Sequence, residues 1–158
     1  MTLGFRNRDC LMRSVRNLVV DVCSELLDSL DTTQQLVVAV QELLENLVKY
    51  SEYGAAELDF ELCLLDGQPT VRIGTSNRAS ERHLSEARCM LDRTISASDP
   101  LELFHALVAT SGERKGSGLG LVRLRAESGL ALSYVVDDDR LRIEASRRVQ
   151  PRRMEMDR

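Results

Sequence analysis

The segment AELDFELCLL at residues 56–65 alternates between apolar side chains and Glu, Asp or Cys. Its alternating large apolar positions are Leu58, Phe60, Leu62 and Leu64. Successive residues of a strand point to opposite faces of a sheet, so this alternation predicts a strand with one buried face and one solvated face. A doubly wound parallel sheet would need continuous apolar strands instead. We therefore expect an α+β two-layer sandwich, with a mixed or antiparallel sheet and helices on one face.

Two amphipathic helices are expected before this strand. Apolar residues recur at helical spacing over about residues 11–30, and they recur again from Leu36 to Leu47. Asp31 or Thr32 is the expected N-cap of the second helix, which should end near Gly54.

The remaining elements follow in a fixed order. Asp66-Gly67 and the segment TVRIGTS complete a hairpin, and residues 79–110 indicate helical pieces, one of them starting at Pro100. A glycine-rich stretch then leads into a helix that ends at Gly129, and residues 131–145 predict two strands around an Asp-rich turn. The expected order is helix, helix, hairpin, helical insert, helix, hairpin.

Length and charge bound the domain organisation. A chain of 158 residues that is 43% hydrophobic suits one domain. We expect this domain at residues 1–146, and a basic, disordered tail at 147–158, where apolar periodicity is lost. The net charge of −4 argues against nucleic-acid binding. No apolar run suits a signal peptide or a membrane helix, so we expect a cytoplasmic protein with no membrane association.

The stretch ERKGSGLGL at residues 113–121 has three glycines at alternate positions: Gly116, Gly118 and Gly120. A dinucleotide fingerprint would need glycine at position 121, where Leu121 stands, and a Walker loop would end in Gly-Lys-Ser/Thr. The stretch still suits an anion, because glycine backbone and a helix start offer N–H donors beside Arg114 and Lys115. A turn or packing device is the alternative interpretation.

A second polar motif lies on the second predicted helix. Glu42, Asn46 and Lys49 are spaced at i, i+4 and i+7, which places them in one sector of the helix. A carboxylate, a carboxamide and an ammonium in one stripe suit a proton acceptor, a Mg²⁺ ligand and a phosphate contact. An ordinary solvated stripe is the alternative.

Together the two motifs resemble those of the GHKL superfamily of ATP-binding domains. ELLENLVKYS is similar to its N box and GSGLGL to its G2 box, and the resemblance extends from about Leu11 to Ala145. The small anti-sigma factor/serine kinase type, including a SiaB-like subgroup of partner-switching proteins, is especially similar. The resemblance implies the Bergerat ATP-binding fold, ATP and Mg²⁺ as cofactors, and a homodimer. It also implies serine/threonine kinase activity on a sigma factor or a STAS-domain antagonist, which the protein would phosphorylate or sequester.

The resemblance further assigns roles to residues. Glu42 would be the general base and Asn46 the Mg²⁺ ligand. Phosphate contacts would come from Lys49, Arg114 and Lys115. The cradle and its neighbours would be Gly116, Ser117, Gly118, Leu119 and Gly120. The insert from about Ala79 to Arg114 would form a lid.

One motif of the superfamily is altered. The G1 box, Asp-x-Gly-x-Gly, supplies an aspartate to the adenine amino group, but this chain has IGTSNRASE there. Ser76 or Asn77 takes the aspartate position, and Arg78 stands where a glycine is expected and could close the pocket. The chain is therefore expected to be an ATP-binding kinase, or alternatively a GHKL-shaped interaction module that has lost nucleotide binding.

Overall fold

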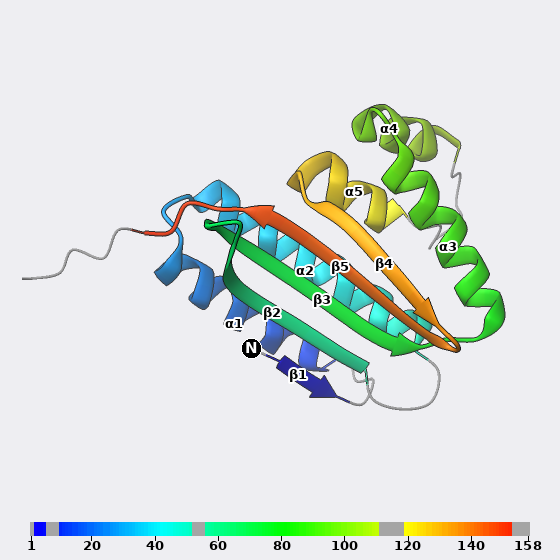
Figure 1. Cartoon of the computed structure of the whole chain (residues 1–158), viewed down its shortest axis with the longest axis horizontal. Helices are drawn as coiled ribbons and strands as arrows, with labels where there is room; N and C mark the ends of the chain where they lie inside the picture. The colour runs from blue at the N-terminus through cyan, green and yellow to red at the C-terminus, as the bar shows by residue number, and fades with distance from the viewer. Residues whose placement is uncertain (1, 6–9, 52–55, 111–118, 153–158) are drawn as a thin grey trace, which may run out of the picture.

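The computed structural model describes residues 2–5, 10–51, 56–110 and 119–152. These residues form an antiparallel sheet with helices against one face (Figure 1). The strands are β1 (Thr2–Phe5), β2 (Ala56–Leu65), β3 (Gln68–Arg78), β4 (Ala131–Asp137) and β5 (Arg140–Arg148). The helices are α1 (Cys10–Leu26), α2 (Leu30–Tyr50), α3 (Glu81–Ser96), α4 (Pro100–Thr110) and α5 (Leu119–Ser128). The predicted α+β sandwich is confirmed.

The sheet has the strand order β1-β2-β3-β5-β4, and every neighbouring pair is antiparallel. Both predicted hairpins are present. Asp66 and Gly67 have φ values of 51° and 74°, as the tight turn between β2 and β3 requires. The sequence did not predict β1, since TLGF is too short to show alternation. β1 pairs with the outer edge of β2, and Thr2 lies opposite Asp59.

The core lies between the sheet and the helices α1, α2 and α5. Leu58, Ile73 and Ile143 of the sheet are buried in one apolar cluster with Leu43 and Leu47 of α2. The prediction of one covered face holds for the first half of β2. Farther along β2, Leu62 is 36% exposed and Leu64 is 73% exposed, so the expected core face extends beyond the helical layer.

The opposite face of the sheet carries no described helix (Figure 1). Arg72 of β3 crosses this face between two carboxylates, at 2.6 Å from Glu144 of β5 and 3.6 Å from Glu61 of β2. Charged cross-strand pairs of this kind suit a face that meets water.

The start of α2 differs from the prediction. Ser29, rather than Asp31 or Thr32, is the N-cap, and its side chain accepts a hydrogen bond from the Thr32 N–H. The helix therefore begins at Leu30, which is 75% exposed and so does not belong to the apolar stripe. The first helix ends at Leu26, four residues earlier than expected. α2 ends at Tyr50, short of the Gly54 that was predicted, and residues 52–55 lie outside the described residues.

The insert between the hairpins forms α3, which lies beside β4, and α4, which lies beside α5 (Figure 1). α4 starts at Pro100 as predicted, yet none of its residues is buried, and Leu101 and Val108 are about half exposed. Among the described residues, no helix has both the length and the apolar character that crossing a membrane requires.

The prediction of a disordered tail is wrong for residues 147–152. β5 continues to Arg148, and Val149 is only 8% exposed. The Arg147 guanidinium donates hydrogen bonds to the Gln35 side chain and the Ser128 carbonyl, and the Arg152 N–H donates to the Leu26 carbonyl. Single-sequence periodicity missed these contacts because their partners lie far away in the chain. Residues 153–158 are outside the described residues.

Truncation after Ser146 should therefore destabilise the protein. Loss of the buried Val149 side chain alone should lower the free energy of unfolding by about 2 kcal/mol, and the melting temperature by roughly 4 °C or more. Thermal and urea unfolding of the two lengths would measure this. A truncation after Arg152 is the matched control and should unfold like the full chain. Equal stability of all three would contradict the placement of residues 147–152.

Candidate functional site

A cavity of about 770 Å³ opens between the helices α2, α3 and α5 and the strands β3 and β5. Its volume falls within the range of small-molecule sites. The lining is largely apolar, with a few amide, hydroxyl and charged groups. Its residues include Leu43, Leu47, Met90, Leu121 and Ile143 from four elements, and Asn46, Tyr50, Asn77 and His83 among the polar ones. An apolar chamber with a few fixed polar groups suits an organic ligand that has a polar end.

Asn46 carries a buried polar group whose hydrogen-bonding capacity is not used. Its Nδ2 atom is buried and has no hydrogen-bond partner among the described residues. Leaving such a group unpaired costs about 1–3 kcal/mol, so a ligand or an ordered water gains by completing it. Rotation of the amide by half a turn exchanges the positions of its nitrogen and its oxygen. The oxygen is a ligand atom that suits Mg²⁺. Asn46 therefore fits the predicted role. No group of three His, Cys, Asp or Glu gathers for metal binding in the described part of the chain.

The structure separates the two candidates for adenine recognition. Asn77 lines the cavity and is 5% exposed, whereas Ser76 points to the other face of the sheet, where its Oγ accepts a hydrogen bond from Arg140. The assignment of Ser76 to the nucleotide site is therefore wrong, because neighbouring strand residues alternate between faces. The Asn77 Nδ2 donates to the Arg78 carbonyl at 3.3 Å, which leaves the side-chain oxygen as the acceptor.

Arg78 does not close the cavity, which was the concern raised by its sequence position. Its side chain is 56% exposed, and its Nε atom lies 3.6 Å from Asp139. Arg78 is absent from the cavity lining. An arginine in this place is therefore compatible with an open chamber.

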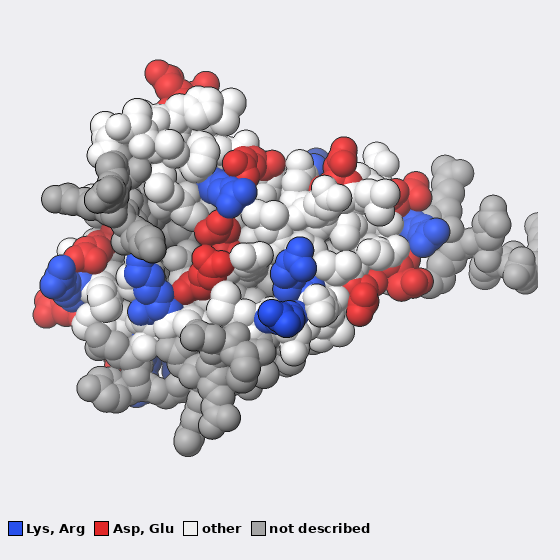
Figure 2. All heavy atoms as spheres, turned by 180° about the vertical axis from the view of Figure 1, so that it is seen from behind, with Lys and Arg blue, Asp and Glu red and all other residues white. Residues whose placement is uncertain are grey.

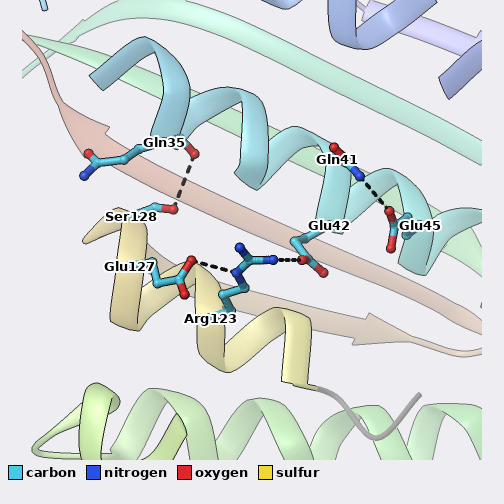
Figure 3. Close-up of polar contacts among 7 residues, drawn as sticks. All are labelled: Gln35, Gln41, Glu42, Glu45, Arg123, Glu127 and Ser128. Carbon is cyan, nitrogen blue, oxygen red and sulfur yellow. Dashed lines mark hydrogen bonds and ion pairs between the residues drawn. The ribbon is translucent and has the colours of Figure 1, made fainter. Parts of the chain in front are cut away.

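Glu42 lies beside the start of α5, on the α2 turn before Asn46 (Figure 3). Its side chain is 19% exposed. A Cβ atom on Gly120, the second residue of α5, would collide with Glu42 Oε2 and lie 3.3 Å from Cδ. The absence of a side chain at Gly120 thus leaves room for the Glu42 carboxylate at the start of α5. This packing role was one of the two interpretations of the glycine stretch.

Sequence reasoning missed Arg123. It lies on α5, three residues after Gly120, and its Nη1 atom donates to Glu42 Oε1 at 3.1 Å (Figure 3). Its Nε atom donates to Glu127 Oε2 at 2.6 Å. A cation within the apolar run LGLVRL was the available signal, since it faces the same helix junction as the glycine.

The pKa of Glu42 is raised above its ordinary value. Burial is the main cause, and the negative charges of Glu45 and Glu127 add to it. The charge and hydrogen bond of Arg123 act in the opposite direction. The carboxylate is therefore held in a setting that strengthens it as a proton acceptor, with Arg123 favouring its ionised form.

The other predicted site residues differ in their placement. Lys49 is exposed on the last turn of α2, with its ammonium 4.9 Å from the Tyr50 ring centre, and it does not line the cavity. Leu119 is the first residue of α5. Arg114, Lys115, Gly116, Ser117 and Gly118 lie outside the described residues. The structure thus brings Asn46 and Asn77 to one cavity, with Glu42 at its neighbouring helix junction.

Charges on the helical side are mixed. Figure 2 shows acidic and basic side chains interspersed there, without a broad basic patch over the described residues of this view.

The fold is similar to that of a known protein. A chain in the crystal structure of the SiaB-SiaC complex from Pseudomonas aeruginosa superposes with a TM-score of 0.66 at 13% sequence identity. The match covers 92% of this chain and 88% of that chain. At this identity the likeness concerns the fold. No protein-family model matches the chain, and no curated protein matches its sequence.

The raised pKa of Glu42 predicts a pH-dependent stability. Because the folded state holds this proton more tightly than the unfolded state, stability falls as the pH rises from about 4.5, the ordinary value, through the folded pKa. The variant Glu42→Gln lacks this titration. The unfolding free energy of the variant minus that of the wild type should therefore increase from below pH 4.5 to neutral pH.

Urea unfolding across this pH range measures the difference. The exposed Glu102→Gln change serves as a control for removing a surface carboxylate. A difference between Glu42→Gln and wild type that stays constant with pH would contradict the raised pKa.

Proposed function

We propose that the protein is an ATP- and Mg²⁺-binding regulatory kinase of the anti-sigma serine/threonine kinase type. The observation that carries the proposal is the 770 Å³ cavity, which is lined by Asn46, with its buried and unpaired Nδ2 atom, and by Asn77. Glu42 lies next to it at the start of α5. The order and spacing of these groups agree with the resemblance to GHKL domains.

Each residue has a distinct task in this proposal. The Asn77 oxygen accepts a hydrogen bond from the adenine amino group, and the apolar lining excludes water from the ring. Asn46 holds Mg²⁺ through its side-chain oxygen. Bound ATP supplies the phosphoryl group. Glu42 accepts the proton of a serine or threonine hydroxyl on the partner, and the start of α5 stabilises negative charge through its N–H groups.

The partner in this proposal is another protein. The similar fold belongs to a chain from a structure named as a complex of two proteins, SiaB and SiaC. We extend this to the present chain as a partner-switching role, in which it phosphorylates or sequesters a sigma factor or a STAS-domain antagonist. A homodimer and a cytoplasmic setting belong to the same proposal.

A binding-only function is the second candidate, and one observation favours it. Asn77 is neutral where the superfamily uses an aspartate, and a neutral acceptor forms a hydrogen bond weaker by about 1 kcal/mol. In that case the protein is a GHKL-shaped interaction module that binds its partner without nucleotide.

Calorimetric titration with ATP and Mg²⁺ tests nucleotide binding. The wild type should bind, and Asn46→Ala should weaken the affinity about 10-fold or more, since a contact to a charged ligand is lost. Asn17→Ala removes an exposed amide from α1 and should bind as the wild type does. Absence of heat from the wild type at millimolar ATP would refute the kinase and favour the binding-only function.

Glu42→Ala tests the assignment of the base. ADP release from ATP, with a STAS-domain protein as phosphate acceptor, should fall by about 10²-fold or more. ATP affinity by calorimetry should change little, since Glu42 is not part of the cavity lining. If turnover survives in Glu42→Ala, another group accepts the proton.

A further inference from the structure

We infer that Arg123 is a positioning residue for Glu42: it holds one carboxylate oxygen and so leaves the other at the start of α5 to accept the proton. The inference rests on the proposed function and adds a residue that the motif resemblance did not assign. In the step it serves, the partner's hydroxyl oxygen bonds to the phosphoryl group and ADP leaves. The hydroxyl proton passes to Glu42.

The two oxygens of Glu42 have different surroundings. Oε1 accepts a hydrogen bond from Arg123 Nη1 at 3.1 Å (Figure 3). Oε2 lies so close to Gly120 that any Cβ there would collide with it. Fixing Oε1 therefore selects one rotation of the carboxylate, with Oε2 at the junction between α2 and α5.

Arg123 is itself held in place. Its Nε atom donates to Glu127 Oε2 at 2.6 Å, one turn later on α5. The planar guanidinium uses two different nitrogens for the two carboxylates, so its plane is set by both. The order Glu127, Arg123, Glu42 thus connects α5 to α2, between residues far apart in the chain (Figure 3). A lysine keeps the charge but has no such fork.

The surrounding charges show why a carboxylate here benefits from a cation. Burial, Glu45 and Glu127 all raise the pKa of Glu42, whereas Arg123 lowers it by its charge and its hydrogen bond. Arg123 thus opposes the protonation that would remove a base. The geometry and the electrostatics favour the same role.

The test compares Arg123→Gln with wild type by two measurements. Carbon NMR titration of the Glu42 side-chain carboxyl, in protein without nucleotide, should show protonation at higher pH in the variant. ADP release from ATP and Mg²⁺, with a STAS-domain protein as phosphate acceptor, should show a kcat lower by on the order of 10²-fold, because the base is misplaced. The KM for ATP should stay within about twofold, since Arg123 does not line the cavity.

Two further variants separate positioning from general structure. Arg123→Lys should restore most of the titration through its charge, and only part of kcat, because it lacks the fork. Arg72→Gln is the matched control, since Arg72 also contacts two carboxylates but on the open face of the sheet. It should alter neither the Glu42 titration nor kcat.

The outcomes distinguish this inference from the proposed function. Wild-type protein that binds ATP and releases ADP, together with an Arg123→Gln variant unchanged in titration and kcat, overturns the inference alone. Equal losses in Arg123→Gln and Arg72→Gln also overturn it, because they indicate a general structural effect. Wild-type protein that binds no ATP overturns both proposals.

Discussion

The close approach of α5 to α2 is the contact on which the candidate site depends. α5 presents Gly120 to Glu42, and no other residue type has room there without moving the carboxylate. The apolar side of the same helix is anchored by Leu121 and Leu124, which are buried in the core. The core therefore fixes the distance between the two helices. Because glycine has no side chain, the space at this distance is filled by the Glu42 carboxylate.

The two faces of β3 contribute to different parts of the protein. The residues of β3 that face the helices include Ile73, which fills the core, and Asn77, which reaches the cavity. Those on the other face include Arg72 and Ser76, whose partners are other sheet residues. A single strand thus contributes to the core, the cavity and the open face, because its side chains alternate between the two layers.

The motifs predicted from the sequence differ in how well they match the structure. The alternation at residues 56–65 and the apolar stripe of α2 predicted the sandwich, since burial on one face imposes a period that a short window can show. The same pattern could not show where the helical layer ends, and Leu64 is exposed for that reason. The strand β1 and residues 147–152 depend on partners outside any local window. The cap at Ser29 is local, since its partner is Thr32. The predicted stripe of three polar residues does not act as one group in the structure. Asn46 faces the cavity, whereas Lys49 lies at the surface.

The sequence by itself determined the order of elements from α1 onward, the covered face of the sheet and the two polar motifs on α2 and before α5. These follow from periodicity and from residue chemistry, which act over one or two turns or strands. Only the tertiary structure decided between Ser76 and Asn77, directed Arg78 away from the cavity and brought Arg123 to Glu42. The physical reason is that the register of a strand and the packing distance between two helices are set by the whole core. Residues 81 positions apart become neighbours only when that core has formed.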